Sequence, residues 1–458
     1  MKKTRLGLCP IGKFVFSHED ALRQKTALQA KLREWQVEFV DLEYVLPDGL
    51  VRDQAHVAPV VEHFRKQAID ALFMPHCNFG TEGAVGMIGR KLGVPTLVWG
   101  PRDEAPLPDG TRLRDTLCGM FASTKVLKKL GVPFTYIENC RLDEPALRSG
   151  VDMFLRAANA ANALRRGMRI GLIGQRIDFF WSTISNESEL LERFNVEVLP
   201  VDMVTFIENA RQRVAGCLLE AAQLMKQLDV ANYPDHEPLA RVLAVRDQML
   251  AHVADNGLDA VAIQDFTSLV DAMGTYCFFA DSLVANTVPL AIESDVHGAI
   301  STALLHRAAF ATTPVFLAEY TVRHPQDDNG VLLWHAGAPT EMCKPGAKVK
   351  LGPHWILPSP LAGMPHFPLR DGDITVARFD GDTGKYRLAV GEGASMPGPH
   401  TQNNYVWMKV DNWPRWERIL MEGEFIHHTA MTYGHYGAAL VEACKYIPGL
   451  EPVRLNED

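Results

Sequence analysis

Short apolar segments alternate with helix-like segments along the first third of the chain. Consecutive strands joined by helices need crossover connections, which produce a mostly parallel sheet covered by helices. The pattern therefore predicts a doubly wound α/β domain over residues 1–166. The predicted strands lie at 5–11, 37–45, 70–76, 94–100 and 132–138, and the predicted helices at 21–36, 60–67, 82–92, 116–130 and 144–165.

The same alternation restarts after residue 166 and predicts a second doubly wound α/β domain over residues 167–312. The two domains have the same predicted architecture, but the second is not an obvious sequence repeat of the first. Its predicted strands are 168–174, 196–202, 259–264 and 288–293, and its predicted helices are 213–228, 239–256 and 270–285.

The pattern changes at about residue 313, where Pro, Gly and aromatic residues become frequent. Short alternating runs appear, and Asp371-Gly372 and Asp380-Gly381 give turn signals between them. This pattern predicts an antiparallel barrel or sandwich over residues 313–458. The expected fold is thus two doubly wound α/β domains followed by a β-rich, barrel-like C-terminal domain. The alternating runs are 374–379, 386–392 and 405–410, with a final helix at 436–446.

Charge and cysteine usage restrict the expected partners and location. The net charge is −9 and no Lys/Arg-rich run offsets it, so we expect neither a nucleic acid nor a membrane partner. No apolar run approaches the 18 residues of a membrane span, and the N-terminus has the pattern of a strand and not of a signal peptide. The eight scattered cysteines form no CxxC pair, which favours buried thiols in the cytoplasm.

Common nucleotide and hydrolase signatures are absent from the sequence. The segment GLIGQR at 171–176 follows a predicted strand, but it lacks the GxGxxG spacing that lets a helix N-terminus approach a pyrophosphate. There is also no GxxxxGK[ST], HExxH or GxSxG motif. These absences disfavour a dehydrogenase or a kinase.

Glu293 follows an apolar run and begins the first of three clusters of ligand-type side chains, together with Asp295 and His297. The carboxyl ends of parallel strands usually present functional groups. Ser294 or Asp295 can also cap the helix that follows. Taken alone, this cluster is more often a cap and a solvated charge than a site.

The other two clusters contain Glu319 with His335, and the pair His427 and His428. Glu319 interrupts an apolar strand, and a buried carboxylate is costly unless it is paired or bound to a cation. For His335 taken alone, a hydrogen-bonded core residue is the favoured interpretation. Neighbouring residues of a strand point to opposite faces, so we expect at most one residue of the pair to bind a metal while the other packs or touches substrate.

Together the clusters offer carboxylate oxygens and imidazole nitrogens at strand ends. This donor set suits a divalent ion such as Mn²⁺. No cysteine lies within the clusters, which argues against structural zinc.

The chain resembles the L-fucose/L-arabinose isomerase superfamily in the segments ESDVHGA, FLAEYTVRHP, LLWHAGAP and GEFIHHTAMTYG. The resemblance implies that Mn²⁺, or another divalent cation such as Mg²⁺ or Co²⁺, is held by Glu293, Glu319 and one histidine of the pair. The family motif favours His428 as that ligand. His335 matches the additional histidine of the arabinose isomerase branch.

The activity that this resemblance implies is aldose–ketose isomerisation, an intramolecular oxidation–reduction, of a pentose or 6-deoxyhexose-type sugar. The reaction would pass through an enediol, with Glu293 and Glu319 moving the proton between C1 and C2. A homo-oligomer, a trimer or hexamer, is implied as well. Further candidate substrate-binding residues are His427, Asp295, His297, Lys13, His76 and Asn78.

Two other functions fit the same residues. One is a two-lobed sugar-binding protein without catalysis, which would need no metal. The other is a metal-dependent epimerase of a related polyol substrate, because enediol chemistry serves both reactions. Bound metal would separate the binding protein from the enzymes, and the identity of the product would separate the enzymes.

Overall fold

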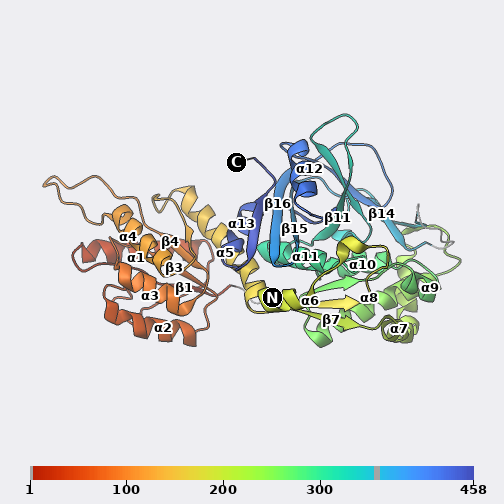
Figure 1. Cartoon of the computed structure of the whole chain (residues 1–458), viewed down its shortest axis with the longest axis horizontal. Helices are drawn as coiled ribbons and strands as arrows, with labels where there is room; N and C mark the ends of the chain where they lie inside the picture. Colours follow the sequence, from red (N-terminus) through yellow and green to blue (C-terminus); the bar gives the residue numbers. More distant parts are fainter. Residues whose placement is uncertain (1–3, 355–361, 458) are drawn as a thin grey trace. The chain divides into compact units, whose positions relative to one another are not determined.

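The structure is a computed structural model that describes residues 4–354 and 362–457. The described chain divides into two compact units, Met1–Asn162 and Ala163–Asp458. Figure 1 shows helices around a sheet in the first unit, and a second helix-flanked sheet with a barrel in the second unit. The predicted segments 167–312 and 313–458 share the second unit, and the boundary between them stays a prediction.

The first unit is a parallel α/β sheet with strand order β2-β1-β3-β4-β5. The predicted strands are present, but β2 and β5 each keep only two paired residues. Helix α1 starts three residues before the prediction because Ser17 caps it by accepting a hydrogen bond from the Asp20 backbone N–H. The strands are β1 Leu6–Leu8, β2 Phe39–Val40, β3 Ala71–Pro75, β4 Thr96–Trp99 and β5 Thr135–Tyr136; the helices are α1 His18–Glu34, α2 Val57–Lys66, α3 Glu82–Leu92, α4 Thr116–Lys129 and α5 Pro145–Arg165.

The second unit begins with another parallel sheet, in the order β10-β9-β6-β7. The single helix predicted at 270–285 is instead two helices. Gly274, with a φ of +68°, ends the first of them in the left-handed conformation that favours glycine. Strands and helices here are β6 Met168–Ile173, α6 Glu187–Phe194, β7 Val196–Val201, α7 Met203–Leu224, β8 Asp229–Val230, α8 Glu237–Asn256, β9 Ala260–Ile263, α9 Ser268–Met273, α10 Phe278–Val284, β10 Leu290–Ala291 and α11 Val296–Ala308.

The C-terminal part closes into a barrel, as the alternating runs predict. Within the described residues, strands β16, β15, β18, β11, β12 and β17 pair in that order, and β17 pairs back with β16. A closed ring leaves no unpaired edge within the barrel. The strands are β11 Phe316–Arg323, β12 Gly330–His335, β13 Lys350–Gly352, β14 Met364–Pro368, β15 Asp373–Asp382, β16 Lys385–Met396, β17 Asn404–Lys409, β18 His428–Tyr433 and β19 Leu450–Arg454; the helices are α12 Trp413–Glu422 and α13 Gly437–Cys444.

One turn prediction in the barrel is wrong. Asp380 and Gly381 lie inside β15, and the β15–β16 hairpin turns two residues later, at Thr383 and Gly384. Both turn residues have positive φ, +50° and +81°, which matches the twist of a tight hairpin. A turn signal in the sequence thus marked a position within the strand.

Helix α11 joins the two layers of the second unit. It contacts β9 and β10 of the parallel sheet and β15 and β18 of the barrel (Figure 1). Because both sides of the helix are covered, nearly all of its residues are buried, including the polar Ser301 and Thr302. Its N-terminus therefore lies between Glu293 on the sheet side and the barrel strands.

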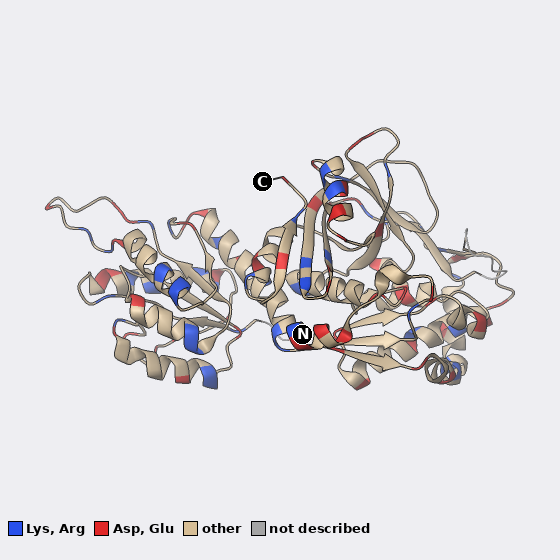
Figure 2. Cartoon of the chain, in the orientation of Figure 1, with Lys and Arg blue, Asp and Glu red and all other residues tan. Residues whose placement is uncertain are grey.

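The charged residues are interspersed over both units, with Lys and Arg beside Asp and Glu on the same helices (Figure 2). The net charge of −9 is thus spread over the chain. Among the described residues, every helix is too short or too polar to cross a membrane.

Candidate metal and active site

Adjacent barrel strands carry three of the predicted ligand residues. Glu319 of β11 lies directly opposite His428 of β18 in the antiparallel register, and opposite Trp334 of β12 on its other side. His335 follows Trp334 at the end of β12. Directly opposed residues have Cβ atoms about 5 Å apart, so the pairing itself brings Glu319 and His428 together.

Glu293 reaches the same place from the parallel sheet. It follows β10 by two residues, in a turn where Glu293 and Ser294 both have left-handed backbone conformations, with φ of +62° and +56°. Each such residue costs on the order of 1–3 kcal/mol, and strain of this kind concentrates at functional sites. The Ser294 N–H donates to the carbonyl of Ile263 at 2.9 Å, which holds the turn against β9.

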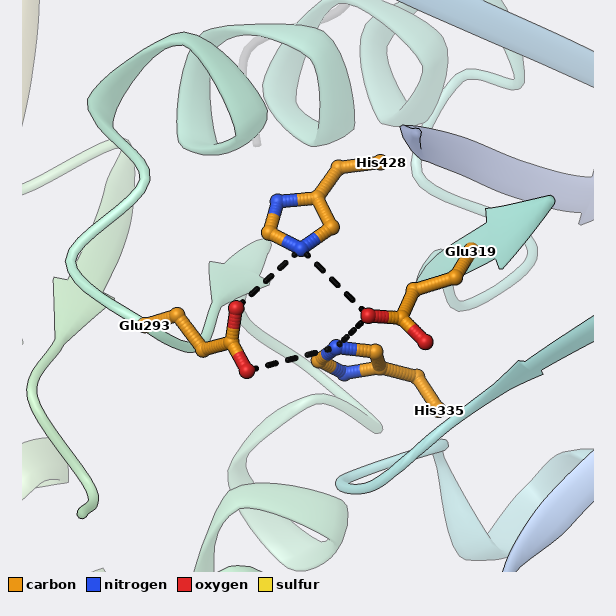
Figure 3. Close-up of side chains that lie close together, drawn as sticks. All are labelled: Glu293, Glu319, His335 and His428. Atoms are coloured by element: carbon orange, nitrogen blue, oxygen red, sulfur yellow. Dashed lines mark ion pairs between the residues drawn. The ribbon is translucent and has the colours of Figure 1, made fainter. Parts of the chain in front are cut away.

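The four side chains converge on one small space (Figure 3). Nε2 of His428 lies 3.2 Å from Oε2 of Glu293 and 3.7 Å from Oε1 of Glu319. Nε2 of His335 lies 3.0 Å from the same Glu319 oxygen and 3.8 Å from Oε1 of Glu293. One ligand atom from each residue lies within 4.8 Å of all the others. The name ligand cluster is used below for Glu293, Glu319, His335 and His428.

Carboxylates and imidazoles of the ligand cluster shift one another's pKa values in opposite directions. Burial raises the pKa of Glu319, but the imidazoles of His335, His427 and His428 outweigh burial and hold that pKa well below its usual range. Burial lowers the pKa of His428, but the carboxylates of Asp295, Glu293 and Glu319 outweigh it and raise that pKa well above its usual range. Carboxylates therefore dominate the surroundings of this fully buried imidazole.

The residues of the ligand cluster fit a divalent cation. Among the described residues, Nε2 of His428 has no hydrogen-bond partner of suitable geometry, although it is completely buried. An imidazole nitrogen in that position, facing carboxylate oxygens, is a typical donor for a divalent metal ion. A cation among Glu293, Glu319 and His428 would supply positive charge to this carboxylate-rich cluster.

The ligand cluster borders a cavity of about 590 Å³. Glu293, Glu319 and His335 line it, together with Trp334 and His354. The rest of the wall is mainly aromatic and aliphatic, including Phe179, Phe180, Phe266, Phe278, Ile292, Val322 and Leu332. This volume exceeds that of a water-filled metal site and accommodates a small organic substrate.

His427 also reaches the ligand cluster, although alternation along a strand predicted that it would point away from His428. It immediately precedes β18, and its Nε2 lies 3.3 Å from Oε1 of Glu319. Its side chain is 50% exposed, whereas that of His428 is fully buried. The alternation argument does not apply because His427 is outside the regular strand.

Asp295 and His297 are buried beside the ligand cluster and bonded to protein groups. Asp295 caps α11 through the Gly298 N–H at 2.8 Å and also accepts from Nδ1 of His428 at 2.9 Å. His297 bonds Asp380 through Nδ1 at 3.1 Å. Neither Asp295 nor His297 is among the described residues that line the cavity. Their predicted contact with substrate stays a prediction.

Lys13, His76 and Asn78 belong to the first unit. His76 is completely buried, with Nε2 2.8 Å from Oγ of Ser123. The side chain of Asn78, also buried, accepts from the Lys13 backbone N–H at 2.7 Å. Nζ of Lys13 lies 4.5 Å above the ring of Phe79. The predicted role of these three residues in substrate binding stays a prediction.

Sequence reasoning missed Arg378, which lies in β15 and bonds Asp295. The signal was available, since Arg378 interrupts the apolar run of β15 just as Glu319 interrupts that of β11. It also missed His354 and the aromatic wall of the cavity. No local pattern marks this wall, because Phe179, Phe266 and Phe278 come from separate loops and helices.

Comparisons with known proteins agree with this architecture. Residues 7–165 match the family described as fucose/sulfoquinovose isomerase, N-terminal domain, and residues 368–449 match L-fucose isomerase, C-terminal domain. One similar solved structure is a periplasmic solute-binding protein from Actinobacillus succinogenes, at 14% identity over 67% of this chain and 92% of that chain; its TM-score of 0.17 is too low to indicate a shared fold.

Full-length relatives extend the match. The sulfoquinovose isomerases of Priestia aryabhattai and Priestia megaterium are each 24% identical over 453 residues, covering 96% of this chain and 97% of theirs. That of Alkalicoccus urumqiensis is 23% identical, covering 73% of this chain and 74% of its own. The chain therefore belongs, as a distant member, to the L-fucose isomerase superfamily, and it is an aldose–ketose isomerase.

Proposed function

We propose that the chain is a divalent-metal-dependent isomerase that interconverts an aldose and a ketose through an enediol. The observation that carries this proposal is the ligand cluster, whose carboxylates and imidazoles come from separate elements of the sheet and the barrel and meet beside a substrate-sized cavity. Such a donor set suits Mn²⁺, with Mg²⁺ or Co²⁺ as alternatives. Glu293, Glu319 and His428 would hold the ion, with His335 as a fourth ligand or a substrate contact.

A bound cation would supply Lewis-acid polarisation of the sugar carbonyl and charge stabilisation at the adjacent oxygen. The chain's own part is the proton transfer. Glu319, which lines the cavity beside its three histidine neighbours, would accept the proton from the carbon next to the carbonyl. Glu293, whose oxygens lie across the same space, would return or relay the proton at the neighbouring carbon. These roles follow from which groups face the cavity.

The substrate that the cavity favours is an uncharged sugar, a pentose or a 6-deoxyhexose. Phe179, Phe180 and Phe266 line the cavity and would offer apolar surface to a bound sugar. None of the described residues that line the cavity is Lys or Arg. The relatives' names point to a sulfonated hexose as the second candidate, and its anionic group would need a cationic partner.

A homo-oligomer, trimeric or hexameric, is also part of the proposal. The cavity wall is incomplete within the second unit, since Phe179 lines it and is still 63% exposed. Trp181 and Ile184 beside it are 74% and 55% exposed. Exposed aromatic residues grouped in this way typically mark a protein interface. A second copy that covers this loop would close the cavity.

The test is to incubate the metal-loaded protein with pentoses, 6-deoxyhexoses and 6-sulfohexoses in D₂O and to identify products by NMR. We expect ketose formation from an uncharged sugar, with deuterium entering next to the carbonyl. Turnover of only the sulfonated sugar would transfer the proposal to the second candidate. A product epimeric at one carbon, or binding without any product, would contradict the proposal.

A further inference from the structure

Arg378 lies within β15 and is a cationic side chain buried in the barrel wall, 1% exposed. Its strand pairs with β18, the strand of His428, and packs against α11, whose N-cap is Asp295. The residue therefore stands where the barrel and the helix meet, behind the ligand cluster and outside the cavity lining.

The guanidinium of Arg378 holds both oxygens of Asp295. Its Nη1 lies 2.5 Å from Oδ2 of Asp295, and its Nη2 donates to Oδ1 at 3.2 Å. Asp295 Oδ2 also accepts from Nδ1 of His428, at 2.9 Å. Asp295 Oδ1 takes the Gly298 N–H at 2.8 Å. Both oxygens of the carboxylate are thus fixed by donors from the helix, the barrel and the histidine.

Arg378 is itself braced from the other side. Its Nε donates to Oδ2 of Asp380 at 3.0 Å, and Oδ1 of Asp380 bonds His297 at 3.1 Å. The planar guanidinium uses three of its N–H groups in fixed directions, which a lysine ammonium cannot reproduce. The plane of the Asp295 carboxylate is therefore set by the arginine.

We propose that Arg378 is a positioning residue for the metal site, acting through Asp295 on His428. The hydrogen bond from Nδ1 to Asp295 fixes both the tautomer and the ring orientation of His428. The remaining nitrogen, Nε2, then faces Glu293 and Glu319, as Figure 3 shows. A ligating imidazole is commonly oriented by a carboxylate on its other nitrogen. What the structure adds here is the arginine that orients the carboxylate.

A purely structural role predicts something different. The first unit contains a matched pair, since Arg114 is equally buried, at 1%, and bonds Asp20 at 2.7 Å and also Glu104. If Arg378 only filled and neutralised the core, then replacing either arginine would lower stability and leave metal affinity unchanged. If Arg378 positions His428, only its replacement weakens metal binding.

This inference rests on the proposed metal dependence, and the experiment separates the two. Full-length wild type, Arg378→Lys, Arg378→Met and Arg114→Met are stripped of metal and titrated with Mn²⁺ by calorimetry. Each is also loaded with Co²⁺ and its visible absorption recorded. Circular dichroism and the midpoint of thermal unfolding identify the folded variants.

We expect both Arg378 variants to bind Mn²⁺ about 10–100-fold more weakly than wild type, the range typical for loss of a partner behind a ligand. The Co²⁺ spectrum should change as well, because the His428 ring loses its fixed orientation. Arg114→Met should keep wild-type affinity and spectrum. If Arg378→Met does not fold, the test rests on Arg378→Lys, which keeps the positive charge but loses the planar guanidinium that binds both oxygens of Asp295.

Wild-type Mn²⁺ affinity and a wild-type Co²⁺ spectrum in a folded Arg378→Lys protein would overturn the inference and leave the proposed metal dependence intact. An equal loss of affinity in Arg114→Met would do the same, because it would show a general effect of stability. Failure of the wild type to bind either ion would overturn the proposed metal dependence, and the inference with it.

Discussion

Two completely buried histidines, one in each unit, have opposite electrostatic environments. His76 follows β3 in the first unit, and its ring nitrogens face the Ser123 hydroxyl and the Met74 carbonyl. Burial lowers its pKa to about 4. His428 begins β18 in the second unit and faces the carboxylates of Asp295, Glu293 and Glu319, which raise its pKa. Burial alone therefore does not distinguish the two histidines; the charge of their neighbours does.

The comparison extends to what surrounds each histidine. The partners of His76 are neutral and satisfy the ring with ordinary hydrogen bonds, which is the pattern of a core residue. The partners of His428 are anionic and leave its Nε2 facing oxygen atoms without a proper hydrogen bond among the described residues. The second arrangement is consistent with a bound divalent cation.

The largest expected effect comes from Glu319→Gln, which keeps the shape and one oxygen donor but cannot accept a proton. We expect turnover to fall by about 10²- to 10⁴-fold, the usual contribution of a general base. Part of the Mn²⁺ binding should remain. Turnover and metal content are measured on the same preparation. Near wild-type turnover with metal bound would show that the base lies elsewhere, with Glu293 as the next residue to replace.

His428→Ala and His76→Gln compare the two histidines directly. The first should weaken Mn²⁺ binding by more than about 100-fold, since loss of a mere hydrogen-bond partner of a ligand already costs about 10–100-fold. The second should leave Mn²⁺ affinity at the wild-type value. Calorimetric titration of both folded variants measures this. Equal losses in the two variants would show that the contrast between the histidines has no functional meaning.

The depressed pKa of His76 should make the free energy of unfolding fall as the pH is lowered. The folded pKa of His76 is about 4, below the 6.5 of an unfolded histidine, so below pH 6.5 the unfolded chain binds a proton that the folded chain excludes. Its contribution is fully present above pH 6.5 and decreases as the pH falls toward 4, by on the order of 3 kcal/mol at most.

Denaturant unfolding of wild type and His76→Gln at a series of pH values isolates this contribution. The difference in unfolding free energy between the two proteins should shrink as the pH falls, because glutamine does not titrate. A constant difference from pH 7 to pH 4 would mean that His76 does not have the depressed pKa that its burial implies.

The smallest effect is expected for His427→Ala. His427 lies 3.3 Å from Glu319, but its side chain is half exposed, and exposed ion pairs contribute about 0.2–1 kcal/mol. Mn²⁺ affinity should therefore fall less than about fivefold. The calorimetric Mn²⁺ titration used for His428→Ala measures this loss as well. A loss of affinity as large as that of His428→Ala would mean that His427 is also a metal ligand.

Much of this arrangement could be predicted from local patterns. The parallel sheets follow from strand–helix alternation, and this prediction of fold class is confirmed. Glu319 could be found because a carboxylate in an apolar strand needs a counter-charge. The membership of the superfamily, inferred from four short segments, is confirmed by matches at both ends of the chain.

What could not be predicted depends on contacts between distant segments. Asp295 is identifiable as a helix cap, but its pairing with Arg378, 83 residues away, exists only once the barrel packs on α11. The turn at Glu293 could not be predicted from residue propensities. Left-handed backbone conformations at two consecutive residues, Glu293 and Ser294, are locally unfavourable and are held by tertiary contacts. Where local preference and structure disagree, as at this turn, the disagreement marks the candidate site.

The central claim is that the ligand cluster holds a divalent cation on which isomerisation depends. The most direct measurement is the metal content and sugar turnover of the full-length protein, before chelation, after chelation and after return of Mn²⁺, Mg²⁺ or Co²⁺ separately. The account predicts about one ion per chain, loss of turnover with its removal, and recovery with Mn²⁺. Full turnover in a preparation shown to be free of metal would contradict it.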